Sequence, residues 1–109
     1  MGFTRYWNRT EKHITKDFVD TVKDIVAESQ KDGIQIRDGE GTGTPVITTQ
    51  GIFLNGDASN GLDYESFVLT NFGGGFDFCK TQGKPYDKVV ARVLTEAEKC
   101  GLVTRVSSD

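Results

Sequence analysis

The feature that most constrains the fold is the stretch 34–81, in which several short strand-like runs follow one another between two amphipathic helical segments. Glycine-rich turns separate these runs, and strands joined by short turns usually pair as antiparallel neighbours. Helices on both sides of such a stretch are expected to cover one face of the resulting sheet. The order of elements therefore predicts an α+β fold: a single two-layer domain with a mainly antiparallel sheet of about five to six strands and two helices packed on one face.

The first helix is predicted at residues 14–33. Thr15 is a favourable N-cap, Asp17 lies in the first turn, where the helix dipole stabilises a carboxylate, and Gly33 suits the end of the helix. The apolar residues of this segment recur at helical spacing and form one stripe: Phe18, Val22, Ile25 and Val26. This stripe is expected to lie in the core.

The second helix is predicted at residues 85–99, because Pro85 is tolerated at a first helical position and Gly101 can end the helix. Strands are predicted outside the two helices, at 2–9 and 102–106. Between the helices, strands are predicted in the short runs 34–37, 45–50, 51–57, 66–72 and 76–81.

The composition limits the class of partner. The chain has 109 residues and a formal net charge of −3, which suggests one domain, 1–109, without the basic face that binding to duplex nucleic acid requires. No apolar run approaches the roughly 20 residues of a membrane span, and the N-terminal segment lacks the apolar stretch of a signal peptide. We therefore expect a cytoplasmic protein with no membrane partner.

Residues for metal or nucleophilic chemistry are few. His13 is the only histidine, and Cys79 and Cys100 have neither zinc-site nor redox-motif spacing. The sequence therefore predicts no metal and no cofactor, and it favours a binding protein over an enzyme. The alternative is an enzyme acting on a phosphorylated or nucleotide substrate, with Asp77 or Asp87 as the base and Cys79 as the nucleophile.

The main candidate site lies in "FDFCKTQGKPYD", which runs from a predicted strand into the second helix. Lys80, Thr81 and Lys84 precede the helix N-terminus, whose unpaired N–H groups and positive dipole end attract anions. Tyr86 can stack on a base, and Asp87 can accept hydrogen bonds in the first helical turn. The competing interpretation is a solvated loop whose lysines keep the protein soluble.

Six further residues are candidate ligand contacts: Arg5, Tyr6, Trp7, Asn55, Ser107 and Ser108. The adjacent Arg, Tyr and Trp can stack on a base or pair with a phosphate, although a core position is the favoured interpretation for Trp7. Asn55 can read a base edge or a ribose. The two serines are expected to reach the site if the last strand lies beside the strand at 76–81.

Several motifs together resemble a family of short uncharacterised proteins from bacteria and tailed phages. They are "GFTRYW" at 2–7, "GTGTP" at 41–45, "FLNG" at 53–56, "FDFCKTQGKPYD" at 76–87 and "VSSD" at 106–109. Members of the family often carry a histidine where this chain has Arg5. The resemblance implies no particular activity, but it implies a clustered site and makes a phage origin plausible.

The sequence therefore predicts a small cytoplasmic protein that binds an anionic, nucleotide-like small molecule at residues 80–87. In a phage setting it would counter host defence by sequestering a signalling nucleotide. The alternative is an acidic inhibitor of a host protein, with Asp20, Asp24 and Glu28 on one face of the first helix. An unpaired strand edge would in addition allow two copies to pair as a homo-oligomer.

Overall fold

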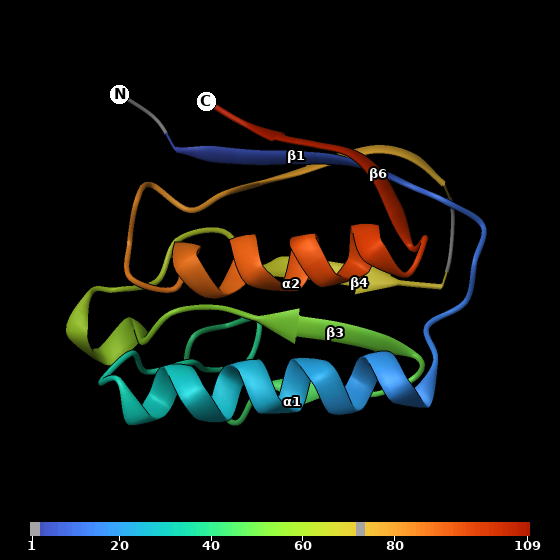
Figure 1. Ribbon diagram of the computed structural model, residues 1–109. Helices are drawn as coiled ribbons and strands as arrows, with labels where there is room; N and C mark the ends of the chain where they lie inside the picture. Colours follow the sequence, from blue (N-terminus) through green and yellow to red (C-terminus); the bar gives the residue numbers. More distant parts are fainter. Residues whose placement is uncertain (1–2, 72–73) are drawn as a thin grey trace.

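The computed structural model describes residues 3–71 and 74–109 and confirms the α+β class (Figure 1). The two helices are α1 (Lys16–Lys31) and α2 (Asp87–Lys99). The strands are β1 (Thr4–Arg9), β2 (Val46–Ile47), β3 (Gly51–Leu54), β4 (Phe67–Thr70), β5 (Gly75–Lys80) and β6 (Val103–Ser108). A short 3-10 turn, Ala58–Asn60, lies between β3 and β4.

The strands form two antiparallel three-stranded sheets, with the orders β5-β1-β6 and β2-β3-β4, whereas we expected a single sheet. The sheets approach each other where the segment before β4 meets the end of β5, since the Glu65 N–H donates to the Lys80 carbonyl oxygen at 3.2 Å. No ladder joins β4 to β5 in the part of the chain that the structure describes. Instead, Arg9 Nε donates to the Thr70 carbonyl oxygen at 2.9 Å. A side chain therefore satisfies a carbonyl that a continuous sheet would have paired.

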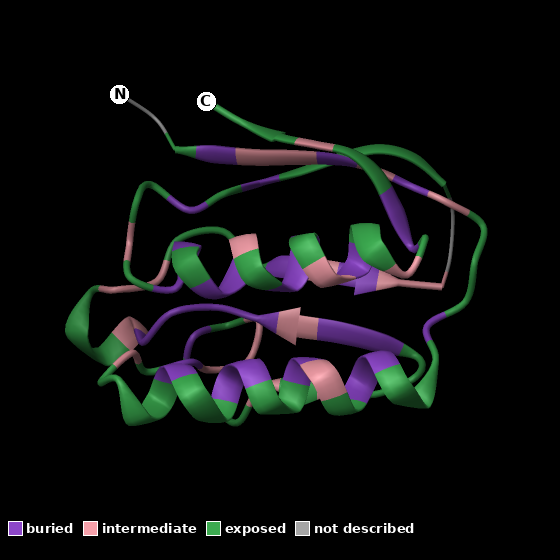
Figure 2. Cartoon of the chain, in the orientation of Figure 1, coloured by how far each residue is buried: buried purple, intermediate pink, exposed green. Residues whose placement is uncertain are grey.

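Both helices form as their apolar periodicity predicts. Thr15 caps α1, since its side chain accepts a hydrogen bond from the Phe18 N–H at 3.2 Å. The predicted stripe of α1 is buried, and α2 buries an equivalent stripe: Val89, Val90, Val93, Leu94 and Ala97. Figure 2 shows that each helix turns its buried face inward and its exposed face to solvent. The helices pack against each other, and α2 also packs against β1 and β6.

The predicted strand at 34–37 is reduced to a single bridge between Arg37 and Asn55. The run 45–50 contributes only the two residues of β2, and the run 66–72 forms β4, although Phe72 lies outside the described residues. Neither helix in the described ranges has both the length and the hydropathy that crossing a membrane requires.

Sheet β5-β1-β6 has one face toward the helices and one face open to solvent (Figure 1). Successive residues of a strand point to opposite faces, so Arg5, Trp7 and Arg9 of β1 share the inner face. Trp7 packs against Phe67 of β4, with ring centroids 5.4 Å apart, and so links the two sheets. Tyr6 lies on the outer face, which no other element of the described chain covers.

Candidate functional site

Arg5, Thr81 and Asp87, all predicted site residues, converge where β1 meets the start of α2. Arg5 donates from Nε to Asp87 Oδ1 at 2.9 Å and from Nη2 to Asp87 Oδ2 at 2.6 Å. The Thr81 hydroxyl, which is fully buried, donates to Asp87 Oδ1 at 2.6 Å. The carboxylate therefore neutralises the arginine, and all three groups already have partners within the protein.

The pKa of Asp87 reflects this cluster. Burial raises the pKa of the carboxyl, but the hydrogen bonds from Arg5 and Thr81 outweigh burial and hold it below its ordinary value. The same contact raises the pKa of the Arg5 guanidinium, chiefly through its hydrogen bond to Asp87. The cluster is a structural tie between β1, the loop before α2 and the first turn of α2.

The backbone at the N-terminus of α2 does not provide the donors that the predicted anion site requires. The N–H groups of Asp87, Val89 and Val90 donate to carbonyl oxygens of Lys84 and Tyr86 at 2.9, 3.0 and 3.1 Å. A tight turn precedes the helix and accepts bonds from N–H groups that an ordinary helix start leaves free. The N–H groups of the first turn are therefore already used.

Two predicted stacking residues are buried and cannot contact a base. Tyr86 is 1% exposed, and its hydroxyl donates to the Glu65 carbonyl oxygen at 2.6 Å. Burial, the largest cause, raises the pKa of this phenol. Trp7 is also 1% exposed, which confirms the core interpretation and excludes its ring as a stacking surface. Both aromatic rings stabilise the core instead.

Asn55 is likewise a structural residue. Its side chain is buried, and Nδ2 donates to the carbonyl oxygens of Gly39 and Tyr64, each at 3.1 Å. Its Oδ1 accepts from the N–H groups of Gly56 and Tyr64 at 2.8 and 3.0 Å. With its amide group saturated by the backbone of two loops, Asn55 has no free group for a base or ribose.

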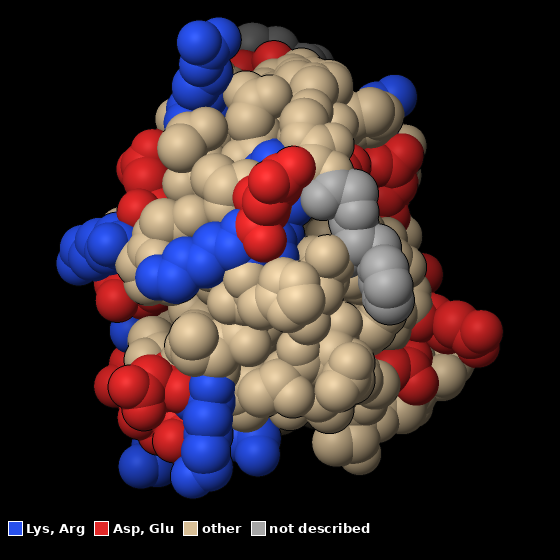
Figure 3. All heavy atoms as spheres, turned by 90° about the vertical axis from the view of Figure 1, so that its right-hand side faces the viewer, with Lys and Arg blue, Asp and Glu red and all other residues tan. Residues whose placement is uncertain are grey.

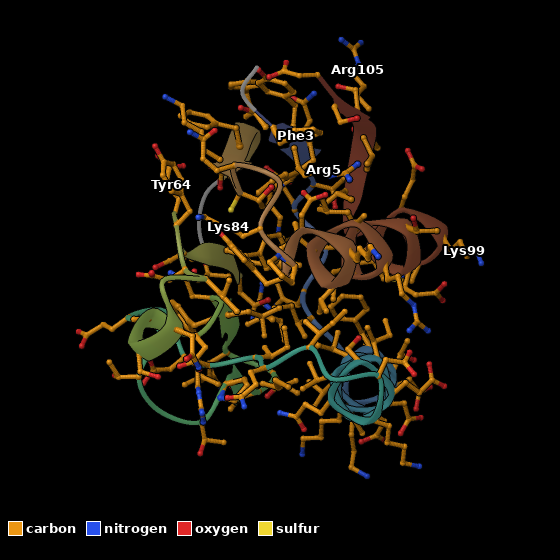
Figure 4. The ribbon with its side chains drawn as sticks, turned by 90° about the vertical axis from the view of Figure 1, so that its left-hand side faces the viewer. Phe3, Arg5, Tyr64, Lys84, Lys99 and Arg105 are labelled. Carbon is orange, nitrogen blue, oxygen red and sulfur yellow. The ribbon has the colours of Figure 1, made fainter. Side chains whose placement is uncertain are left out.

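Lys80 and Lys84, unlike the buried candidate residues, are at least partly exposed to solvent. Lys80 is exposed on β5, and Lys84 is half-buried in the loop before α2, at the end of the molecule that also carries Phe3 and Arg5 (Figure 4). Neither ammonium forms an ion pair within the described ranges. Lys80 pairs with Thr4 in the β1–β5 register and points to the outer face of the sheet, whereas Lys84 lies off the sheet. Lys80 therefore belongs to the sheet, and Lys84 belongs to the loop that follows it.

The outer face of sheet β5-β1-β6 carries three aromatic rings. Tyr6 stacks on Phe76, with centroids 6.0 Å apart and planes at 25°, and Phe76 lies 6.0 Å from Phe78. Phe76 is 65% exposed and Phe78 is 43% exposed. We call Tyr6, Phe76 and Phe78 the aromatic face. The cost of leaving two large apolar rings in water makes this face the strongest candidate binding surface.

The register places one predicted serine on the aromatic face. Tyr6 lies opposite Phe78 on β5 and opposite Ser107 on β6, so these three residues form a row across the sheet. Ser108 lies opposite Arg5, so its side chain points to the other face. Sequence reasoning missed Phe76 and Phe78, although the alternation Phe-Asp-Phe places both rings on one face of a strand.

Cys79 is poorly suited to nucleophilic chemistry. It is fully buried, and burial, the largest cause, raises the pKa of its thiol to about 12. Its Sγ lies 3.5 Å from the Glu65 carbonyl oxygen, to which it can donate. Among the described residues, no three or more His, Cys, Asp or Glu side chains are grouped so that they would hold a metal ion.

No protein-family model, no curated protein and no solved structure matches the chain. The resemblance to short bacterial and phage proteins therefore stays a sequence-based expectation.

Proposed function

We propose that this protein binds an anionic, nucleotide-like small molecule on the aromatic face. A base would stack on the rings of Phe76, Phe78 and Tyr6, and the Lys80 ammonium would contact a phosphate. The observation that carries the proposal is the exposure of two phenylalanine rings, 65% for Phe76 and 43% for Phe78, beside a tyrosine on the neighbouring strand. The proposed binding site is therefore the outer face of the sheet, whereas the sequence analysis placed the site in the 80–87 loop.

Stacking on exposed rings supplies the apolar part of the interaction. Each base stacked on an aromatic side chain is worth about 1–3 kcal/mol, and every base has a face that can stack. The rings already lie at spacings typical of aromatic pairs, 6.0 Å between centroids, so binding requires little rearrangement.

The charge pattern favours a small anion over a long polyanion. Lys80 lies two residues beyond Phe78 on β5, on the same face, and Ser107 offers a hydroxyl in the adjoining row. The chain as a whole is acidic, with a formal net charge of −3. At the end seen in Figure 3, basic and acidic side chains are intermingled and form no broad basic surface. One lysine suffices for a phosphate but not for a duplex.

The test is calorimetric titration with nucleoside monophosphates, the matching nucleosides and inorganic phosphate. Phe76→Ala and Phe78→Ala are each expected to weaken nucleotide affinity by about tenfold, since each removes one stacking ring. The free energy of unfolding should change by less than about 1 kcal/mol, because exposed side chains contribute little to it.

Lys80→Ala and Lys84→Ala form a matched pair of variants. The first removes the ammonium on the aromatic face, and the second removes an ammonium outside it. Lys80→Ala is expected to lower affinity for the nucleotide but not for the nucleoside, and Lys84→Ala is expected to change neither. Equal losses in both variants would return the ligand to the 80–87 loop, and absence of nucleotide binding would reject the proposal.

In a phage-infected bacterium, such a protein would sequester a signalling nucleotide and so counter host defence. The support for this cellular role is the resemblance to phage proteins, and the burial of Cys79 favours binding of the nucleotide over its turnover. Its test is whether expression of the protein lowers the free concentration of a cyclic or linear signalling nucleotide in bacterial cells, with Phe76→Ala as the control.

A second candidate function is inhibition of a basic host protein. The groove between α1 and α2, about 450 Å³ in volume, is lined by acidic Asp24, Glu28 and Glu96 together with Arg92. Arg92 pairs with Glu28 at 2.8 Å and Lys99 pairs with Glu96 at 3.3 Å, so Asp24 is the lining carboxylate without an ion pair in the described residues. Asp24→Lys would weaken capture of such a partner, and Phe78→Ala would not. The opposite result would favour the aromatic face.

A further inference from the structure

Arg9, at the end of β1, is a buried cation with spare donors. The residue is 8% exposed. Nε donates to the Thr70 carbonyl oxygen at 2.9 Å, and Nη1 donates to the carbonyl oxygens of Thr10 and Leu102 at 2.7 and 2.8 Å. Nη2 is buried and has no hydrogen-bond partner in the part of the chain that the structure describes. Both N–H groups of one guanidinium nitrogen are therefore left unsatisfied.

The charge of Arg9 is also uncompensated. No carboxylate forms an ion pair with it within residues 3–71 and 74–109. Burial lowers the pKa of the guanidinium, but an arginine in a protein keeps its proton. A buried charge without a counter-ion is unfavourable, and neutral carbonyl oxygens compensate it only in part.

A cavity lies beside this arginine, in the gap between β4 and β5. It measures about 100 Å³ and is lined by Arg9, Val68, Phe76 and Asp77, among others. A water molecule occupies about 30 Å³ in the liquid, so the cavity has room for one small polyatomic group but not for a base or a sugar. Arg9 is one of the residues that line this cavity, so the side chain that carries the unsatisfied donors borders the space.

We propose that this cavity binds an oxyanion group, a phosphate or a carboxylate, with the Arg9 guanidinium as its principal ligand. Guanidinium groups form strong, charge-assisted hydrogen bonds with such oxyanions. The inference goes beyond nucleotide binding on the aromatic face and does not depend on it. The oxyanion is either free in solution or part of a larger molecule whose remainder lies outside the cavity, beside Phe76.

Asp77 makes the proposal sharply testable, because it is an acidic residue that lines the same cavity. This carboxylate accepts a hydrogen bond from the Phe78 N–H at 2.8 Å and forms no ion pair with Arg9. A negative charge there repels an incoming anion. Asp77→Asn keeps the size and the acceptor oxygen of the side chain, so it should tighten anion binding without disturbing β5.

The first experiment is titration of the protein with inorganic phosphate against chloride at matched ionic strength, followed by NMR of the arginine guanidinium groups. The expected result is saturable binding that perturbs the Arg9 resonances. Asp77→Asn should tighten it by about threefold or more. Arg9→Lys should weaken it by about tenfold, since a lysine cannot reproduce the planar donor set. Arg105→Lys, at an exposed arginine, is the matched control and should change nothing.

Further arms identify the source of the oxyanion. Acetate and a nucleoside monophosphate are titrated in parallel with phosphate. Phosphate binding that persists in the Phe78→Ala variant would support the Arg9 site even if no nucleotide stacks on the aromatic face. The two proposals can therefore be rejected separately. Non-saturable titration, unperturbed Arg9 resonances, or weaker binding in Asp77→Asn would each overturn the inference. These readouts stay decisive if Arg9→Lys does not fold.

Discussion

Arg5 and Asp87 are 82 positions apart in the chain, yet their side chains meet in a two-pronged ion pair with N–O distances of 2.9 and 2.6 Å. This pair attaches the N-terminal strand β1 to the first turn of α2, and the Thr81 hydroxyl completes it. Residues that sequence analysis assigned to a ligand are therefore bound to one another.

Asp87→Ala and Arg5→Ala are each expected to lower the free energy of unfolding by about 2–3 kcal/mol, because each leaves the partner's charge partly buried and unpaired. In a double-mutant cycle, the two losses should couple by about 1–2 kcal/mol. Urea unfolding of the four proteins measures both quantities. If the two losses in free energy of unfolding are simply additive, the interaction between Arg5 and Asp87 does not stabilise the fold.

The same carboxylate predicts a pH dependence. The pKa of Asp87 lies below its ordinary value in the folded protein, despite the opposing effect of burial. Its contribution to stability is therefore complete above the unfolded pKa of about 4 and is lost as the pH falls through the lower folded pKa. Asp38 and Asp57 also have lowered pKa values, so the whole protein loses stability in acid for several reasons.

Comparison with Asp87→Asn isolates the one carboxylate. The difference in free energy of unfolding between the two proteins should be constant near neutral pH and shrink below about pH 4. Chemical unfolding at a series of pH values checks this. A difference that persists unchanged in strong acid would show that charge at position 87 is not what stabilises the fold.

Cys79 is expected to be unreactive in the native protein. Its thiol is fully buried, and with a pKa of about 12 only roughly one molecule in ten thousand carries the thiolate at pH 8. A thiol reagent should label Cys100, which is partly exposed, and should label Cys79 only after unfolding. The Cys100→Ser variant leaves Cys79 as the thiol to be labelled. Rapid native labelling of that variant would contradict the prediction and reopen the nucleophile hypothesis.

Asn55→Ala is expected to lower the free energy of unfolding by about 2–4 kcal/mol, because it leaves buried backbone groups of Gly56 and Tyr64 without partners. Gln50→Ala, at an exposed polar residue, is the control and should cost less than about 0.5 kcal/mol. Thermal and urea unfolding measure both. A stable Asn55→Ala protein would indicate that the amide is not needed for the loops and would restore Asn55 as a ligand candidate.

The elements of the fold were predictable because they depend on local patterns. The apolar stripe of α1, its Thr15 cap and the helical spacing of α2 are properties of neighbouring residues. The split into two sheets was not predictable, since it depends on which strands pair across long stretches of chain. At the boundary, Arg9 of β1 donates to the Thr70 carbonyl oxygen of β4, 61 positions along the chain. A strand pattern specifies that a residue pairs, but not with which strand.

The sequence indicated which residue types gather at the candidate site, but not whether their side chains contact a ligand or one another. Lysine, threonine, tyrosine and aspartate in one loop are typical of anion binding, and the same residues also build internal hydrogen-bond networks. Burial decides between the two, and burial depends on distant segments: Tyr86 is covered because Glu65 and Lys80 lie around its hydroxyl. In the sequence, Phe76 and Phe78 have the pattern of ordinary core residues. In the structure they are exposed, because their face of the sheet is open to solvent.

The sequence by itself determined the α+β class, the two helices with their buried faces and the positions of most strands, because hydrophobic periodicity and turn residues act over a few positions. The tertiary structure alone decided that Arg5, Thr81 and Asp87 stabilise the fold, that Arg9 is buried without a counter-charge, and that three aromatic rings share an open face. The physical reason is that partnership and solvent exposure are set by contacts between segments distant in the chain, and composition does not encode which segments meet.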